Sequence, residues 1–169
     1  MASIARCLRI ARPSVVSAFA QSSVRIARPF SVTANNELRK YTREHEWIEL
    51  SDDKKTGYVG ISSYAAKALG DVVFVELPEE GKEVQAGDAL GAVESVKSAA
   101  DINAPISCKV IASNLTLEES PSTINKVPED HSASGGWVAK VQVSEEGIKD
   151  LEKLMDEEAY KEFTAAEDH

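Results

Sequence analysis

The most distinctive chemical group in this chain is a lysine in a short polar turn. The stretch GAVESVKSAADINAP runs from Gly91 to Pro105, and apolar and polar side chains alternate on both sides of Lys97. This alternation predicts a β-hairpin with Lys97 at its tip, although the turn lacks the Asn-Gly or Asp-Gly pair that usually forms such hairpins. An amine held in solvent is poorly placed as a buried catalytic base. It is well placed to carry a covalently attached group that must move.

Other groups that could do chemistry fit structural roles better. Cys108 lies within the apolar stretch Ile106–Ile111, where no helix N-terminus would activate its thiol, so we expect a small residue in a sheet. One such cysteine and three scattered histidines, His45, His131 and His169, lack the spacing of a zinc site. We expect His131 to be exposed in a polar loop. The chain has no phosphate loop, dinucleotide fingerprint or HExxH motif, and its carboxylates favour a solvated acidic surface over a general acid–base pair.

The charge of the chain divides sharply. Residues 1–36 contain five arginines, six serines and no acidic residue, which leaves 14 basic residues against 28 acidic ones in the rest of the chain. This composition predicts a mitochondrial transit peptide over residues 1–36, ending between positions 30 and 37. Arg28-Pro29-Phe30-Ser31 resembles a matrix processing site. Arginines interrupt every apolar run, so a secretory signal fits worse and no membrane span is expected; a disordered basic arm is the remaining alternative.

Processing would remove Cys7 and leave Cys108 alone, which suits a reducing matrix and allows no intramolecular disulfide. The strongly acidic body makes nucleic acid an improbable partner. Residues 37–169 are long enough for one domain with its own core.

The first half of this domain reads as short strands and one helix. Ser62 or Ser63 can cap the helix, and Gly70 can end it in the left-handed conformation. The expected elements are a hairpin of Glu44–Leu50 with Tyr58–Ile61, a helix through Leu69, a buried strand over Asp71–Leu77 and an edge segment over Gly81–Val84.

In the second half, strands continue and then give way to helical periodicity. Expected strands are Ala89–Val96, Ile106–Ile111 and Trp137–Val143, with a helix beginning at Ser120 and Pro121. Ser144 would cap a helix whose apolar stripe is Ile148, Leu151, Leu154 and Met155, and a second helix after Asp156 would turn Ala159, Tyr160 and Phe163 inward. The predicted fold is mainly β: a flattened β-barrel or sandwich of two antiparallel sheets with short helices and a C-terminal helix.

Several separated motifs carry a resemblance that runs from about Leu38 to the end of the chain. They are Val93-Glu94-Ser95-Val96-Lys97-Ser98 with Asp101, Ala104, Pro105 and Ser107 after it, His45-Glu46-Trp47, Val59-Gly60-Ile61-Ser62, and Gly70-Asp71-Val72-Val73-Phe74-Val75-Glu76-Leu77-Pro78. These motifs, in this order, resemble the glycine cleavage system H protein family. The resemblance implies a lipoyl-domain-like fold and a lipoic acid cofactor bound covalently to Lys97.

The same resemblance implies a non-catalytic, monomeric carrier in the mitochondrial matrix. A glycine decarboxylase (P protein) would load the lipoyl arm with the aminomethyl group of glycine, and an aminomethyltransferase (T protein) would pass that group to tetrahydrofolate. Dihydrolipoyl dehydrogenase (L protein) would reoxidise the arm, and lipoyl-attaching enzymes would install it. A tethered intermediate of this kind reaches a high effective concentration at each partner.

The resemblance also implies that Glu46 and Asp101 contact the amine of the loaded arm, where a carboxylate would favour the protonated form. The alternative for each is a plain surface acid. Two departures from the family stand out: Glu44 replaces a small polar residue, and Cys108 replaces a glycine. The first puts the role of Glu44 in any cleft in doubt, and we interpret the second as a change in packing.

Four alternatives remain open. A biotin carboxyl carrier usually has methionines around its lysine, and the lipoyl domain of a 2-oxoacid dehydrogenase usually has an aspartate just before it. Val96 and Ser98 fit neither pattern. An unmodified interaction module would need no acceptor lysine. A relay that passes lipoyl groups to other enzymes would use the same Lys97.

Overall fold

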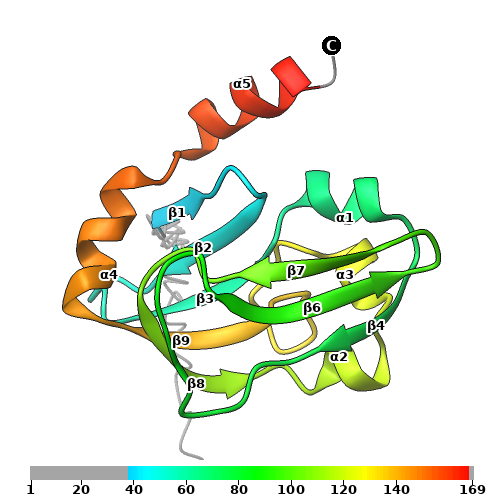
Figure 1. The fold of residues 1–169 in the computed structure, drawn as a ribbon, viewed down its shortest axis with the longest axis horizontal. Coiled ribbons are helices and arrows are strands. Elements are labelled where there is room, and N and C mark those ends of the chain that lie inside the picture. Colours follow the sequence, from blue (N-terminus) through cyan, green and yellow to red (C-terminus); the bar gives the residue numbers. More distant parts are fainter. Residues whose placement is uncertain (1–37, 168–169) are drawn as a thin grey trace, which may run out of the picture. The chain divides into compact units, whose positions relative to one another are not determined.

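The computed structural model describes residues 38–167, which form two antiparallel β-sheets with short helices (Figure 1). The larger sheet has the order β1-β2-β3-β9-β8-β5, with bounds Leu38–Tyr41, Glu46–Leu50, Thr56–Ile61, Ala139–Val143, Cys108–Ser113 and Glu83–Val84. The smaller sheet has the order β4-β6-β7, with bounds Val72–Glu76, Ala89–Ser95 and Ala99–Asn103. The predicted fold class is confirmed. The predicted transit peptide, residues 1–36, and its boundary lie outside the described residues.

The helices are short and stand between or after the strands. Their bounds are α1 Ser63–Leu69, α2 Thr116–Glu119, α3 Thr123–Lys126, α4 Glu145–Asp150 and α5 Glu157–Glu167, with a 3-10 helix η1 at Leu151–Lys153. In the part of the chain that the structure describes, no helix has the length and apolar character needed to cross a bilayer.

Each sheet turns one face into an apolar core. Side chains of the larger sheet, including Ile48, Val59, Val110 and Val141, pack in one buried cluster. In the smaller sheet, Val72, Val75, Val93 and Ile102 pack with residues of α1, α2 and α3 in a second cluster. Complete burial of side chains of this size stabilises a fold by about 1.5–3 kcal/mol each. Val93 of β6 and Ile102 of β7 therefore anchor the Lys97 hairpin to the body.

The predicted first hairpin is confirmed as β2 and β3, which pair from Glu46 opposite Ile61 to Leu50 opposite Gly57. The sequence analysis missed β1, which pairs with β2 at the edge of the larger sheet. The segment Leu38–Tyr41 contains two adjacent cations and shows no clear alternation. Its place in the sheet is supported instead by Arg39, which pairs with the buried carboxylate of Glu49.

Helix α1 begins as predicted, because the Ser62 hydroxyl accepts a hydrogen bond from the Ala65 N–H at 3.1 Å. Its end differs from the prediction. Gly70 has φ 78° and ψ −153°, so its φ is positive but it lies outside the left-handed helical region. The Asn125 side chain explains this exit: it donates to the Gly70 carbonyl at 2.7 Å and accepts from the Val72 N–H at 2.9 Å, which directs the chain into β4.

The prediction that Asp71–Leu77 is a buried strand was wrong for most of its residues, because only two of the seven are buried. Val72 and Val75 are buried, but Val73 and Phe74 are 54% and 52% exposed. The pairing of β4 with β6 shifts between Val72 and Phe74, which marks a β-bulge with Val73 as the extra residue. The bulge turns two successive apolar side chains toward solvent, which composition alone could not predict.

The strand expected at Ile106–Ile111 is β8, shifted by two residues toward the C-terminus, and the edge segment at β5 is confirmed. The helix expected to begin at Ser120 and Pro121 was placed incorrectly. Helix α2 ends at Glu119, and the Ser120 N–H caps it by donating to the Thr116 carbonyl at 2.9 Å. Pro121 therefore lies in the link before α3.

Ser144 caps α4 as predicted, with its hydroxyl accepting from the Gly147 N–H at 3.0 Å. Two members of the predicted apolar faces are exposed, Ile148 of α4 and Ala159 of α5. The predicted stripe also does not lie on one α-helix, because α4 ends at Asp150 and the 3-10 helix η1 follows at Leu151. Tyr160 is buried as expected, and its ring stacks on Tyr41 at a centroid separation of 4.3 Å.

Candidate functional site

The turn that carries Lys97 is closed by the hydroxyl of Ser95. The Ser95 N–H donates to the Ser98 carbonyl at 2.8 Å. The Ser95 hydroxyl oxygen accepts from the N–H groups of Lys97 at 3.1 Å and of Ser98 at 3.0 Å. Serine side chains can organise turns through such local bonds to the backbone. Ser95 therefore explains how the hairpin turns without an Asn-Gly pair, a role that the sequence analysis missed.

The hairpin is also held from its side. Within the turn, the Val96 N–H donates to the Asp71 carbonyl at 3.1 Å, which ties the tip to the segment that enters β4. Val93 and Ile102 face the core from β6 and β7. In Figure 1 the hairpin projects to one side of the body, with α1 above it and β4 below it. The predicted hairpin is thus confirmed, and contacts with the rest of the domain hold it in place.

Lys97 is exposed at the tip, as predicted. Its side chain lies beside the end of α1, because a Cβ atom placed on Gly70 would be 3.3 Å from both the Cε and the Nζ atoms of Lys97. Within residues 38–167 the amine forms no hydrogen bond or ion pair. The nucleophilic atom is therefore accessible for acylation, and a group attached there would start next to α1.

Glu46 is buried rather than a surface acid, with 2% of its area exposed. Its Oε1 accepts from the Asn103 N–H at 2.9 Å, and its Oε2 accepts a short hydrogen bond from the Thr42 hydroxyl. Glu46 borders a hollow of about 400 Å³ formed by the β1–β2 turn, the end of β7 and the segment before α5. Glu44, whose role in a cleft was in doubt, borders the same hollow.

Asp101 is exposed on β7 and lies on the outer face of the smaller sheet. It is opposite Ala92 of β6, which in turn is opposite Glu76 of β4, so the two carboxylates share a face across a small residue. Asp101 borders a different hollow from Glu46, one of about 380 Å³ next to Glu76 and Lys82. The structure therefore does not bring the two candidate arm contacts into one pocket.

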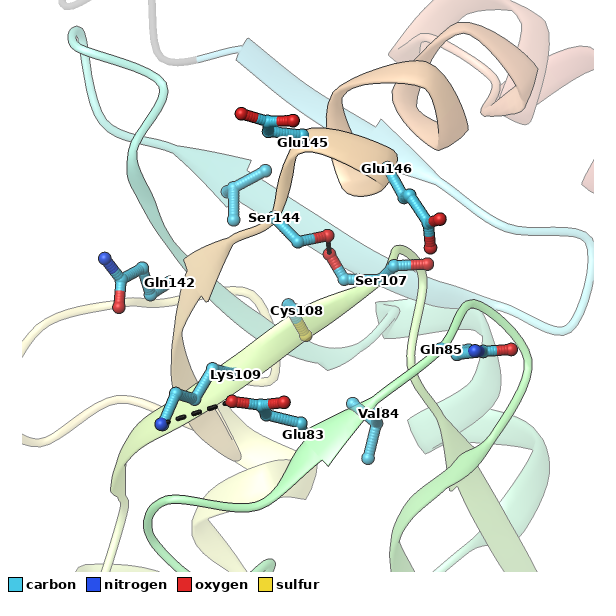
Figure 2. Close-up of a pocket in the computed structure, with 11 residues that line it drawn as sticks. Glu83, Val84, Gln85, Ser107, Cys108, Lys109, Gln142, Ser144, Glu145 and Glu146 are labelled. Carbon is cyan, nitrogen blue, oxygen red and sulfur yellow. Dashed lines mark hydrogen bonds and ion pairs between the residues drawn. The ribbon is translucent and has the colours of Figure 1, made fainter.

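A third hollow, of about 570 Å³, borders Cys108 and contains neither Lys97 nor Glu46 (Figure 2). The Ser144 hydroxyl donates to the Ser107 carbonyl at 2.7 Å across it, and Lys109 pairs with Glu83 at 3.3 Å on its rim. Burial raises the pKa of the Cys108 thiol to about 11, so little thiolate forms at neutral pH. This geometry supports the interpretation of Cys108 as a packing residue rather than a nucleophile. Cys108 is the first residue of β8.

His131 is only partly exposed, contrary to the prediction of an exposed loop residue. Its Nδ1 lies 2.7 Å from Oε1 of the buried Glu49, whose other oxygen is held by Arg39. This polar cluster joins β1, β2 and the loop before β9, and sequence patterns gave no signal for it because its members are far apart in the chain. Among the described residues, no group of three or more His, Cys, Asp or Glu side chains could hold a metal ion.

Two antiparallel sheets, with a lysine displayed at the tip of a hairpin in the smaller one, define a lipoyl-domain-like protein. The sequence model of the glycine cleavage H-protein family matches residues 39–167, and the chain belongs to that family.

Individual relatives agree with this assignment. The chain is 47% identical over 130 residues to the glycine cleavage system H protein of Thermotoga maritima, which covers 77% of this chain and 98% of the relative. It is 44% identical over 141 residues to glycine cleavage system H protein 2, mitochondrial, of Arabidopsis thaliana, covering 83% of this chain and 85% of the relative. The crystal structure of a glycine cleavage system H protein from Mycobacterium marinum matches with a TM-score of 0.63 and 36% identity, over 78% of this chain and 97% of that one.

Proposed function

We propose that this protein is the lipoylated carrier of the glycine cleavage system, with the lipoyl group in amide linkage to Nζ of Lys97. The observation that carries the proposal is an exposed amine that has no charged partner within residues 38–167, held at a hydrogen-bonded turn within the family match. When bound, the lipoyl group supplies a disulfide that can be opened and closed by thiol exchange. The lysine amine, which forms no hydrogen bond or ion pair with the described residues, fits such an attachment.

In this proposal the protein carries the aminomethyl group of glycine from the P protein to the T protein, and the L protein reoxidises it. The chain itself contributes no catalytic group: its task is to hold the attachment point rigidly and present it to successive partners. The resulting effective concentration replaces diffusion of a free intermediate. The acidic body would associate quickly with basic partner surfaces and release them as quickly.

Glu46 and Asp101 remain proposed contacts for the amine of the loaded arm. The buried carboxylate of Glu46 would favour a cationic amine, and each of its oxygens has a further lone pair beyond the bonds to Asn103 and Thr42. Asp101 offers a solvated carboxylate on β7. Since the two side chains border different hollows, one amine at one moment would meet only one of them.

We place the mature protein in the mitochondrial matrix, as a monomer that binds neither nucleic acid nor membrane. The acid-free, arginine-rich segment over residues 1–36 supports import, and the matching Arabidopsis relative is described as mitochondrial. Its partners would be the P, T and L proteins and the enzymes that attach lipoate.

The test is the intact mass of the protein isolated from mitochondria, beside Lys97→Ala and Lys54→Ala variants. Lys54 is an exposed lysine in the turn between β2 and β3, so it is a matched control. We expect one lipoyl group in the wild type and in Lys54→Ala, and none in Lys97→Ala. A biotin-sized addition would assign a carboxylase carrier. If no mass is added to this protein under conditions where other lipoyl proteins are modified, the unmodified interaction module is the remaining alternative.

The second arm of the test measures transfer. Lipoylated protein incubated with glycine and the P, T and L proteins should support tetrahydrofolate-dependent ammonia release, and Lys97→Ala should support none. Full activity of Lys97→Ala in this assay would contradict the proposal.

A further inference from the structure

Exposed apolar side chains gather around the attachment lysine. Seven large apolar side chains are exposed among residues 38–167. Three of them are Val96 in the Lys97 turn, 68% exposed, and Val73 and Phe74 of β4, the strand that pairs with β6 of the hairpin, at 54% and 52%. We call these three residues the tip patch. Clustered exposed apolar groups on a monomer mark interaction surfaces more often than scattered ones do.

The backbone holds the tip patch in a fixed shape. The bulge between Val72 and Phe74 turns Val73 and Phe74 outward, and the Val96 N–H bond to the Asp71 carbonyl fixes the third member next to them. The neighbouring buried residue Val75 packs in the core. Little conformational entropy would therefore be lost when a partner covers the patch, and such preorganised apolar anchors bind efficiently.

Several carboxylates lie around the patch, beside the amine of Lys97. Phe74 is opposite Glu94 in the sheet, and Glu76 and Asp101 lie further along the same outer face. Asp71, at the entry to β4, is also exposed. A complementary surface would have an apolar pocket bordered by lysine or arginine side chains.

The position of the patch beside Lys97 indicates which of the enzymes that act on the lipoyl arm would contact it. Enzymes that use the sulfur atoms of a lipoyl group can work at the far end of a long tether. The enzyme that installs this group must bring its reaction centre to Nζ of Lys97 itself, and must therefore cover the turn and its neighbours.

We propose that the tip patch is the docking surface for the enzyme that acylates Lys97, an inference that rests on the function proposed above. In the acylation, Nζ forms the amide bond to the carbonyl carbon of an activated lipoyl donor. The bond from that carbon to its activating group breaks, the activating group leaves with the electron pair, and Nζ releases its protons to a base.

The experiment measures acylation of the unmodified protein by a lipoate–protein ligase with lipoate and ATP, followed by intact mass. Phe74→Ser and Val73→Ser are compared with Ile148→Ser on α4, a control at the same 54% exposure as Val73. A second pair compares Val96→Ser in the turn with Leu115→Ser, which are 68% and 66% exposed. Thermal unfolding of each variant reports folding, which substitutions of such exposed side chains should leave nearly unchanged.

We expect the KM for the protein substrate to rise about tenfold in the patch variants, with kcat within about twofold, a change that corresponds to about 1.4 kcal/mol of binding. The controls should match the wild type. The KM of the wild type should also rise with salt, because salt screens the acidic rim.

Equal KM values in patch and control variants would overturn the inference. Normal acylation combined with defective loading from glycine would assign the patch to a later enzyme, and would overturn it as well. Failure of the proposed function is distinguishable, because the wild-type protein itself would then gain no lipoyl mass.

Discussion

Ser95 shows how one hydroxyl can replace a turn sequence. It is the local reason that Lys97 stands at a defined tip, since its oxygen accepts two backbone N–H groups of the turn. The hairpin and its lysine could be predicted from period-two alternation. The closing role of Ser95 could not, because serine is common in every loop and its partners depend on the turn geometry.

Ser95→Ala is therefore expected to destabilise the protein by about 1 kcal/mol, the usual net value of such a hydrogen bond. Urea unfolding measures the change, and hydrogen exchange at the Lys97 and Ser98 amides should accelerate. Ser98→Ala is the matched control, because the Ser98 side chain forms no hydrogen bond within the described residues. Equal destabilisation by both variants would refute this role.

The family resemblance predicted Glu46 as a contact for the amine of the loaded arm, with a plain surface acid as the alternative, and the folded protein buries its side chain. Glu46→Ala would leave the partly buried Asn103 N–H without its acceptor, at a cost of about 1–3 kcal/mol. Glu46→Gln keeps an oxygen for that N–H and should cost less. Chemical denaturation of the unlipoylated protein gives both values; the reverse order would mean that charge, rather than the bond to Asn103, holds this side chain.

At the scale of elements, local signals were sufficient for the hairpins and for the start of α1. They failed where tertiary contacts decide. The bulge in β4 depends on its pairing with β6, and the exit from α1 depends on Asn125, which is 55 residues away from Gly70. Ile148 of α4 is exposed although Leu151, three residues later, is buried. Such contacts between distant residues leave no periodic trace in a sequence.

The phenol of Tyr160 is one of the links between helix α5 and the site region. The Tyr160 hydroxyl lies 2.7 Å from the Ser62 hydroxyl, which caps α1, and 2.9 Å from Nδ1 of His45, which precedes Glu46 and has φ 74°. Burial raises the pKa of Tyr160 to about 12, so the phenol stays protonated in the neutral range.

Tyr160→Phe keeps the stacking on Tyr41 but removes this link. We expect a loss of about 1–2 kcal/mol in the free energy of unfolding and faster proteolysis within α5. Thermal melts and limited trypsin digestion measure the two effects. Unchanged digestion together with unchanged stability would show that the stacking and the other contacts of α5 hold the helix without this hydroxyl.

In the whole molecule acidic residues outnumber basic ones, and one carboxylate, that of Asp150, predicts how stability depends on pH. The ion pair with Lys153 lowers the pKa of Asp150 below its usual 3.8, and hydrogen bonds from Ser107 lower it further. A carboxylate with a depressed folded pKa contributes stability that is complete above the unfolded value and is lost as pH falls through the folded one.

The free energy of unfolding should therefore decrease as pH falls below about 4, and the decrease should be smaller in Asp150→Asn. Urea titrations at a series of pH values between 2 and 7 measure it. Identical slopes for variant and wild type would show that other carboxylates account for acid unfolding.

The solitary position of the Lys97 amine has a consequence for how the cell can monitor this protein. Because no carboxylate in the described residues pairs with that amine, converting it to an amide would break no ion pair and bury no orphaned charge. The charged and uncharged forms of the carrier should then unfold at the same temperature, although they separate on isoelectric focusing. Chaperones and proteases recognise unstable proteins, so they would not distinguish the unmodified protein from the modified one. Only enzymes that contact the hairpin tip would then detect that the prosthetic group is missing.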